Sequence, residues 1–119
     1  MRQVLAGAEL VLSSTLTLVE CDRVLIRAVA VGGLEEALAA ERRARLRSAV
    51  EHWILFDLDP DIVDRARRPF PKEPVRTLDA IHLATAVLAQ SLVPDLELLS
   101  LDDRVRSAAT LMGLRLLPR

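Results

Sequence analysis

Apolar and polar positions along the chain predict an alternation of short strands and longer helices. Four short apolar runs have the length of buried strands, and they occupy residues 10–13, 53–59, 96–101 and 114–117. Helical spacing is found between them, at residues 13–31, 34–53, 78–90 and 102–112, with a short helix opening at Asp59-Pro60. Residues 2–9 look like the tail of a further helix. This order predicts an α/β fold with a mainly parallel sheet flanked by helices.

Residues that favour helix ends mark most of these boundaries. The expected N-caps, whose side-chain oxygens accept free N–H groups of the first turn, are Ser13 or Ser14, Asp59 and Thr77. The glycines expected to end helices are Gly32, Gly33 and Gly113. Three prolines predict an irregular loop at residues 67–76. The helix at 34–53 is amphipathic, and its apolar face holds Leu34, Ala37, Leu38, Leu46 and Val50.

Composition narrows the class of protein. The chain has 119 residues, which is the size of one domain covering residues 1–119, and 51% of them are hydrophobic. A net charge of −1 gives no overall attraction to nucleic acid or to a membrane. The single Cys21 excludes an intramolecular disulfide and indicates a reducing compartment. Without a membrane-length apolar run or a signal peptide, we expect a cytoplasmic protein.

Three acidic residues stand where parallel α/β sheets bind ligands, beyond the carboxyl ends of strands. Glu20 lies about two turns into the helix that follows the strand at 10–13, on a partly apolar stripe. Asp79 lies in the first turn of a helix that is apolar nearly all round and is therefore expected to be central. Asp102 directly follows the strand at 96–101.

Each of these acids also has a purely structural explanation. Glu20 can pair with Arg23 or Arg27, Asp79 can complement a helix dipole, and Asp102 can cap the next helix in competition with Asp103. If the three gather instead, their repulsion requires a cation, and carboxylate oxygens select Mg²⁺ or Mn²⁺. Such a centre suits hydrolysis of phosphodiesters. An unrelated α/β protein would hold the three acids far apart.

Three blocks of the sequence together resemble a known family. "LSSTLTLVECDRVL", "TLDAIHLATAVL" and "LLSLDDRVRSAATLMGLRLLP" are similar to successive blocks of PIN domains, and more narrowly of VapC-type toxins of bacterial toxin–antitoxin pairs, over residues 10–118. The resemblance implies a Mg²⁺- or Mn²⁺-dependent ribonuclease that a small antitoxin inhibits and that forms a homodimer. It also implies that Glu20, Asp79 and Asp102 are the catalytic metal ligands, with Ser100 nearby.

The beginning of the family's pattern has no match in this chain. PIN domains open with a short apolar strand that ends in a metal-binding Asp, and this strand lies in the middle of the sheet. We therefore expect an N-terminally incomplete PIN-like fold. Three explanations are open: a start of the reading frame upstream of Met1, a degraded copy, or a gap filled by rearrangement or by a partner's strand. The alternative function is a catalytically impaired scaffold that binds an antitoxin or dimerises.

Other polar clusters carry weaker signals. His82 is expected to pack and form hydrogen bonds in the core rather than bind metal. The acids at 57–64 lack the glycine and final glutamate of a calcium loop, so capping and solvation explain them. A basic stretch precedes the helix of Asp79 and offers a path for an RNA backbone, although no aromatic residues interleave it for base stacking; its members are Arg65, Arg67, Arg68, Lys72 and Arg76.

Overall fold

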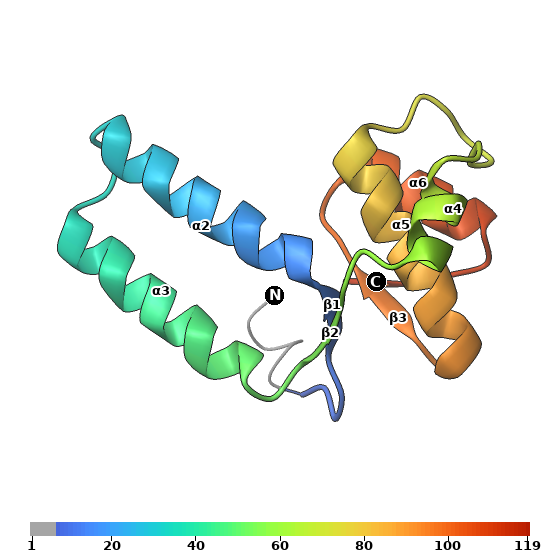
Figure 1. Cartoon of the computed structure of the whole chain (residues 1–119), viewed down its shortest axis with the longest axis horizontal. Coiled ribbons are helices and arrows are strands. Elements are labelled where there is room, and N and C mark those ends of the chain that lie inside the picture. The colour runs from blue at the N-terminus through green and yellow to red at the C-terminus, as the bar shows by residue number, and fades with distance from the viewer. Residues whose placement is uncertain (1–6) are drawn as a thin grey trace. The chain divides into compact units, whose positions relative to one another are not determined.

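The computed structural model describes residues 7–119, and within this range the chain forms five helices and four strands (Figure 1). In chain order these are β1 (Leu12–Ser14), α2 (Thr15–Ala30), α3 (Glu36–Val50), β2 (Ile54–Phe56), α4 (Pro60–Ala66), α5 (Thr77–Leu92), β3 (Glu97–Leu99), α6 (Asp103–Leu111) and β4 (Arg115–Leu117). The predicted order of elements is confirmed for this part of the chain, with strands shorter than the apolar runs that predicted them.

The strands pair in parallel, as the α/β pattern predicts. β1 pairs with β2 in the register Ser13 to Leu55, and β3 pairs with β4 in the register Leu98 to Leu116. Among the described residues these are two separate two-stranded ladders. The chain also divides into two compact units, a hairpin unit of residues Leu10–Asp57 and a C-terminal unit whose larger part is Leu58–Arg119. Each unit contains one ladder.

Two long helices lying side by side make up most of the hairpin unit (Figure 1). α2 begins at Ser14, whose hydroxyl accepts from the N–H of Leu16 at 3.1 Å, so Ser14 rather than Ser13 is the N-cap. The helix ends before Gly32, which adopts a left-handed φ of +79° that disfavours other residues. Across the pair, Arg43 of α3 lies 3.5 Å from the carboxylate of Asp22 of α2.

The apolar face predicted for α3 is only partly buried. Leu34, Leu46 and Val50 are half-buried, whereas Ala37 and Leu38 are exposed. The one buried residue among those described on α3 is Ala39, which the amphipathic pattern did not select. α3 packs mainly against α2, and a helix that packs mainly against one neighbour buries a narrower stripe than the sequence offers.

The C-terminal unit is built around α5, which is central as its apolar sequence predicts. Six of its residues are buried: Ala80, Leu83, Ala84, Thr85, Ala86 and Ala89. Most are alanines, whose small side chains allow α4 and α6 to approach α5 closely. Phe70, Val105 and Leu114 complete the core from the preceding loop, from α6 and from the segment before β4.

The start of α5 differs from the sequence prediction. Thr77 does not cap the helix but is its first residue, and the residue in the cap position is Arg76, which makes no side-chain capping bond. The loop before it is irregular as predicted, and the Glu73 carboxylate organises it by accepting the N–H groups of Phe70 and Val75, each at 2.7 Å. Asp59 caps α4 as predicted, accepting from the N–H of Ile62 at 2.9 Å.

Two further expectations concern the N-terminus and the membrane. Of the helix tail expected at 2–9, residues 2–6 lie outside the described range, and residues 7–9 are not helical. No helix within residues 7–119 combines the length and the apolar character that crossing a membrane requires.

Arg106 joins the ends of β3 and β4. Its guanidinium donates to the carbonyl oxygens of Ser100 at 2.8 Å, Leu117 at 3.1 Å and Pro118 at 2.7 Å. We expect Arg106→Ala to lower the free energy of unfolding by about 2 kcal/mol, because three carbonyls lose a charged donor. Urea unfolding of both proteins measures this. Arg104→Ala, on the exposed side of the same helix, is the matched control, and an equal effect of the two substitutions would contradict the assignment.

Candidate functional site

Asp102 stands between β3 and α6 and caps the helix. One carboxylate oxygen, Oδ1, accepts the N–H groups of Arg104 at 2.9 Å and Val105 at 3.1 Å, while the Asp102 N–H donates to Ser100 Oγ at 3.2 Å. Asp103, the competing candidate, is instead the first residue of the helix. The structural explanation given by the sequence is therefore confirmed, but the cap uses only one of the two oxygens.

The second oxygen of Asp102 shares a cationic partner with Asp79. Arg76 donates from Nε to Asp79 Oδ2 at 3.1 Å and from Nη2 to Asp102 Oδ2 at 3.1 Å. Asp79 lies in the first turn of α5, and its side chain is 21% exposed, compared with 39% for Asp102. The fold of the C-terminal unit thus brings two of the three candidate acids to one guanidinium group.

Backbone hydrogen bonds and nearby positive charges keep Asp102 ionised. The N–H of Val105 lowers the pKa of its carboxyl group below the usual value, the N–H of Arg104 and the positive charges of Arg76 and Arg104 add to this, and partial desolvation opposes it. Because the shift is downward from a value that is already acidic, Asp102 carries a full negative charge at neutral pH. The site therefore presents an anion toward its cationic partner.

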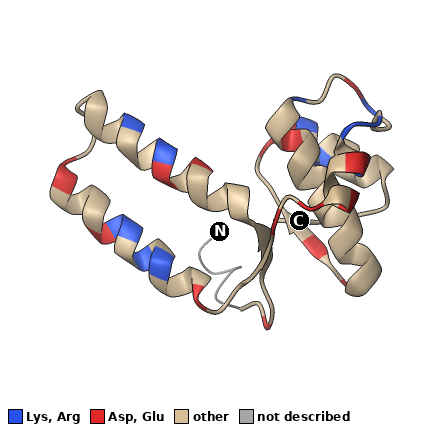
Figure 2. Cartoon of the chain, viewed as in Figure 1, with Lys and Arg blue, Asp and Glu red and all other residues tan. Residues whose placement is uncertain are grey.

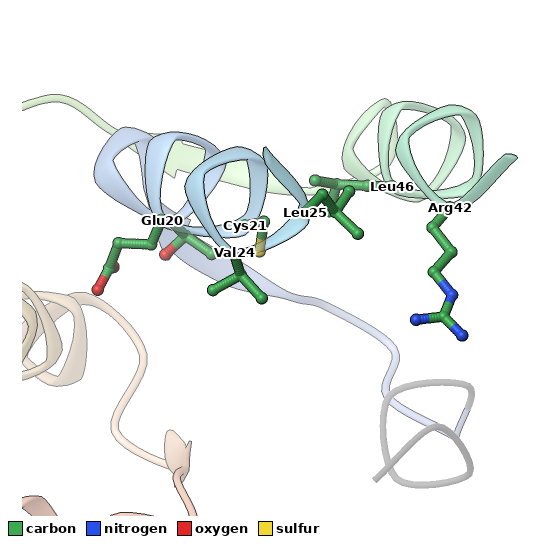
Figure 3. A pocket seen from close by; sticks show the side chains of 7 residues that line it. Glu20, Cys21, Val24, Leu25, Arg42 and Leu46 are labelled. Atoms are coloured by element: carbon green, nitrogen blue, oxygen red, sulfur yellow. The ribbon is translucent and has the colours of Figure 1, made fainter. Parts of the chain in front are cut away.

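Glu20 lies in the hairpin unit, on α2. It lines an open groove of about 510 Å³ between α2 and α3, together with Cys21, Val24, Leu25 and other residues of the two helices. Figure 3 shows the Glu20 carboxylate at one end of this groove and the Arg42 guanidinium at the other. The groove is otherwise mainly apolar, so Glu20 is its anionic group. Its assignment as a metal ligand comes from the sequence alone.

The donor atoms of the C-terminal unit fit a hard divalent cation. Asp79 and Asp102 each direct a carboxylate oxygen at one shared positive group, and such oxygens are preferred ligands of Mg²⁺ and Mn²⁺. Magnesium is commonly held by only one or two carboxylates, with water completing its shell. Among residues 7–119, no group of three or more His, Cys, Asp or Glu side chains is arranged to hold a metal ion. Asp79 and Asp102 are therefore the two carboxylates of this unit that would hold such an ion.

Arg76 is the site residue that sequence analysis missed. The sequence placed it only on a possible RNA path, although its spacing of three residues from Asp79 already predicts an ion pair at a helix start. Its contact with Asp102 has no local signal. His82 is half-buried on α5. Figure 2 shows Lys and Arg residues along α3 and in the loop between α4 and α5, and in that loop Arg67, Arg68 and Lys72 are exposed.

Comparisons with known proteins identify the family. The family model of the PIN domain matches residues 1–111. Ribonuclease VapC46 of Mycobacterium tuberculosis is 42% identical over 91 residues, which are 76% of this chain and 66% of that protein. Ribonuclease VapC35 of the same species is 34% identical over 103 residues, which are 87% of this chain and 68% of that protein. The chain spans about two thirds of the length of these curated relatives. It belongs to the PIN domain family and is a VapC-type PIN domain.

Proposed function

We propose that this chain is a metal-dependent ribonuclease that hydrolyses RNA phosphodiesters, the toxin of a toxin–antitoxin pair. The observation that carries the proposal is the approach of Asp79 and Asp102 to one cationic group, in a chain of the PIN domain family. Relatives that are named ribonucleases support the reaction class. Mg²⁺ or Mn²⁺ is the proposed cofactor.

The roles of the two acids follow from their contacts. Two N–H groups of α6 hold Oδ1 of Asp102, which orients the second oxygen, Oδ2, toward Arg76, and Asp79 is held on a helix whose body is buried. Together they provide the negative charge that binds the divalent ion. When bound, such an ion supplies an activated water and neutralises charge on the scissile phosphate. The exposed Arg67, Arg68 and Lys72 would bind the RNA backbone by charge.

Glu20 is proposed as a further catalytic metal ligand on the strength of its motif. Its family block, "LSSTLTLVECDRVL", places an acid on the helix after the first matched strand. A Glu20→Gln variant preserves size and removes charge. We expect it to weaken RNA cleavage, and unchanged cleavage would remove Glu20 from the site.

An antitoxin and a second copy of the chain are the proposed protein partners. Large apolar side chains of the hairpin unit are exposed, including Val19 at 57%, Val24 at 67% and Val31 at 74%. A contiguous patch of such side chains would be a protein-binding surface. A cytoplasmic location remains a prediction from the sequence, as does the organisation of residues 1–119 as a single PIN-like domain.

The second candidate function is a PIN-like scaffold without catalysis, which binds an antitoxin or dimerises. It is favoured by the two-carboxylate site of the C-terminal unit, because the described residues form no group of three metal-ligating side chains. On this proposal the chain still binds its protein partners but does not cleave RNA.

A labelled-RNA assay separates the two functions. The full chain is incubated with RNA and Mn²⁺, with a chelator in parallel, and compared with the double variant Asp79→Asn, Asp102→Asn. Cleavage that requires Mn²⁺ and disappears in the double variant supports the ribonuclease. Cleavage that resists the chelator and the substitutions identifies a contaminating nuclease. If the folded wild-type chain cleaves no RNA at any Mn²⁺ concentration tested, the ribonuclease proposal is wrong. The scaffold proposal is then retained.

A further inference from the structure

The guanidinium of Arg76 lies at the position where a cation shared by Asp79 and Asp102 would be expected. Two of its nitrogens, Nε and Nη2, bind one oxygen of each acid, both at 3.1 Å. Two carboxylates that bind the same guanidinium group repel each other unless a positive charge compensates them. Arg76 supplies that charge from within the chain.

The side chain of Arg76 is free to leave while its backbone stays in place. Its carbonyl oxygen accepts the N–H of Ala80 at 2.8 Å, which fixes the first turn of α5. Its side chain makes no capping bond and is 65% exposed. Moving the guanidinium into water therefore breaks the two ion pairs without disturbing the helix.

We propose that Arg76 is a built-in counter-ion that holds Asp79 and Asp102 together in the metal-free protein and that a divalent cation must displace. Arg76 is thus a positioning residue that sets the metal affinity of the site. The proposal rests on the metal site of the proposed function. It goes further, because it assigns a competitor for that site within the same chain.

The exposure of the two ion pairs determines how strongly the Arg76 guanidinium competes with Mn²⁺ for the two carboxylates. Pairs in contact with water contribute little individually, so a divalent ion with two carboxylate ligands can replace the guanidinium. Removing the competitor leaves the same two ligands with an unbalanced negative charge. We therefore expect Arg76→Ala to bind Mn²⁺ about three- to tenfold more tightly than wild type. The difference should shrink at high ionic strength, which screens exposed pairs.

Calorimetric titration of the full chain with Mn²⁺ tests this. Arg76→Ala is compared with wild type, and Arg76→Gln, which keeps most of the side-chain length, replaces it if the alanine variant is unstable. Arg104→Ala is the matched control, because Arg104 also acts on Asp102 by charge but donates only its backbone N–H to it. We expect the control to change the affinity by less than about twofold, since its side chain occupies no ligand position.

A melting experiment gives a second readout that does not depend on activity. Without metal, Arg76→Ala should melt below wild type, because its two acids are uncompensated. At saturating Mn²⁺ the two melting temperatures should converge, because the metal replaces the missing charge. If the role of Arg76 were purely structural, Arg76→Ala would melt below wild type by the same amount with and without Mn²⁺.

The possible results are distinct. Tighter binding by the Arg76 variant, together with converging melting temperatures, supports the proposal. If Asp79→Asn abolishes Mn²⁺ binding, the metal site stands. If, in addition, the folded Arg76 variant binds Mn²⁺ only as tightly as wild type or more weakly, the counter-ion role is overturned. If neither wild type nor the Arg76 variant binds Mn²⁺, the metal site and the counter-ion role both fail.

Discussion

Asp79→Asn is expected to slow Mn²⁺-dependent RNA cleavage by on the order of 100-fold or more, because the site loses half of the carboxylate charge that the C-terminal unit supplies. The substitution keeps the size of the side chain, and the buried residues of α5 are untouched. Loss of metal binding should therefore occur without loss of the fold. Calorimetric titration with Mn²⁺ and initial rates of cleavage of a labelled RNA measure the two effects.

Asp103→Asn is the control for Asp79→Asn. Asp103 is the exposed first residue of α6, next to the site in sequence, and its substitution removes the same charge. It should change the Mn²⁺ affinity and the cleavage rate only slightly. Equal losses in the two variants would mean that general charge, rather than a ligand at position 79, governs the activity.

Asp102 has two roles that two substitutions should separate. Asparagine keeps a side-chain oxygen that can accept the N–H groups of Arg104 and Val105, and it is a good N-cap. Asp102→Asn should therefore unfold at nearly the wild-type temperature, yet lose Mn²⁺ binding and cleave RNA on the order of 100-fold more slowly. Asp102→Ala lacks both the acceptor and the charge, so it should lose stability as well as activity.

Thermal melting without metal, followed by Mn²⁺ titration, measures both Asp102 variants. The informative comparison is between the two substitutions rather than with wild type, because both remove the ion pair with Arg76. A lower melting temperature for the alanine variant confirms the capping role. If Asp102→Asn binds Mn²⁺ as wild type does, Asp102 is a structural cap only, and the ribonuclease proposal loses one of its two ligands in this unit.

The local features of the fold could be predicted because they depend on residues within one turn of each other. Ser14, Asp59 and Asp102 cap helices where the sequence places a short polar side chain before an apolar periodic stretch. The central position of α5 follows from apolar residues on all of its faces. Thr77 misled the prediction because the chain enters the helix one residue earlier, at Arg76, although a hydroxyl residue is the commoner cap.

Contacts between distant residues were beyond the sequence patterns. Arg76 and Asp102 lie on different elements, and their ion pair depends on how the start of α5 stands beside the end of β3. The same holds for Arg106, whose three carbonyl partners come from the ends of two strands. Neither arginine has a sequence signal for these partners, because the partners lie many residues away in the chain and meet the arginine only in the folded unit.

By itself the sequence determined the order of strands and helices, their parallel pairing, the family and the acids worth testing, since periodicity, capping and motif spacing are recorded along the chain. The tertiary structure alone decided that Asp79 and Asp102 face one guanidinium, and that this group belongs to Arg76. The physical reason is that a charge cluster is stabilised by distances in space, and packing around the small residues of α5 sets those distances.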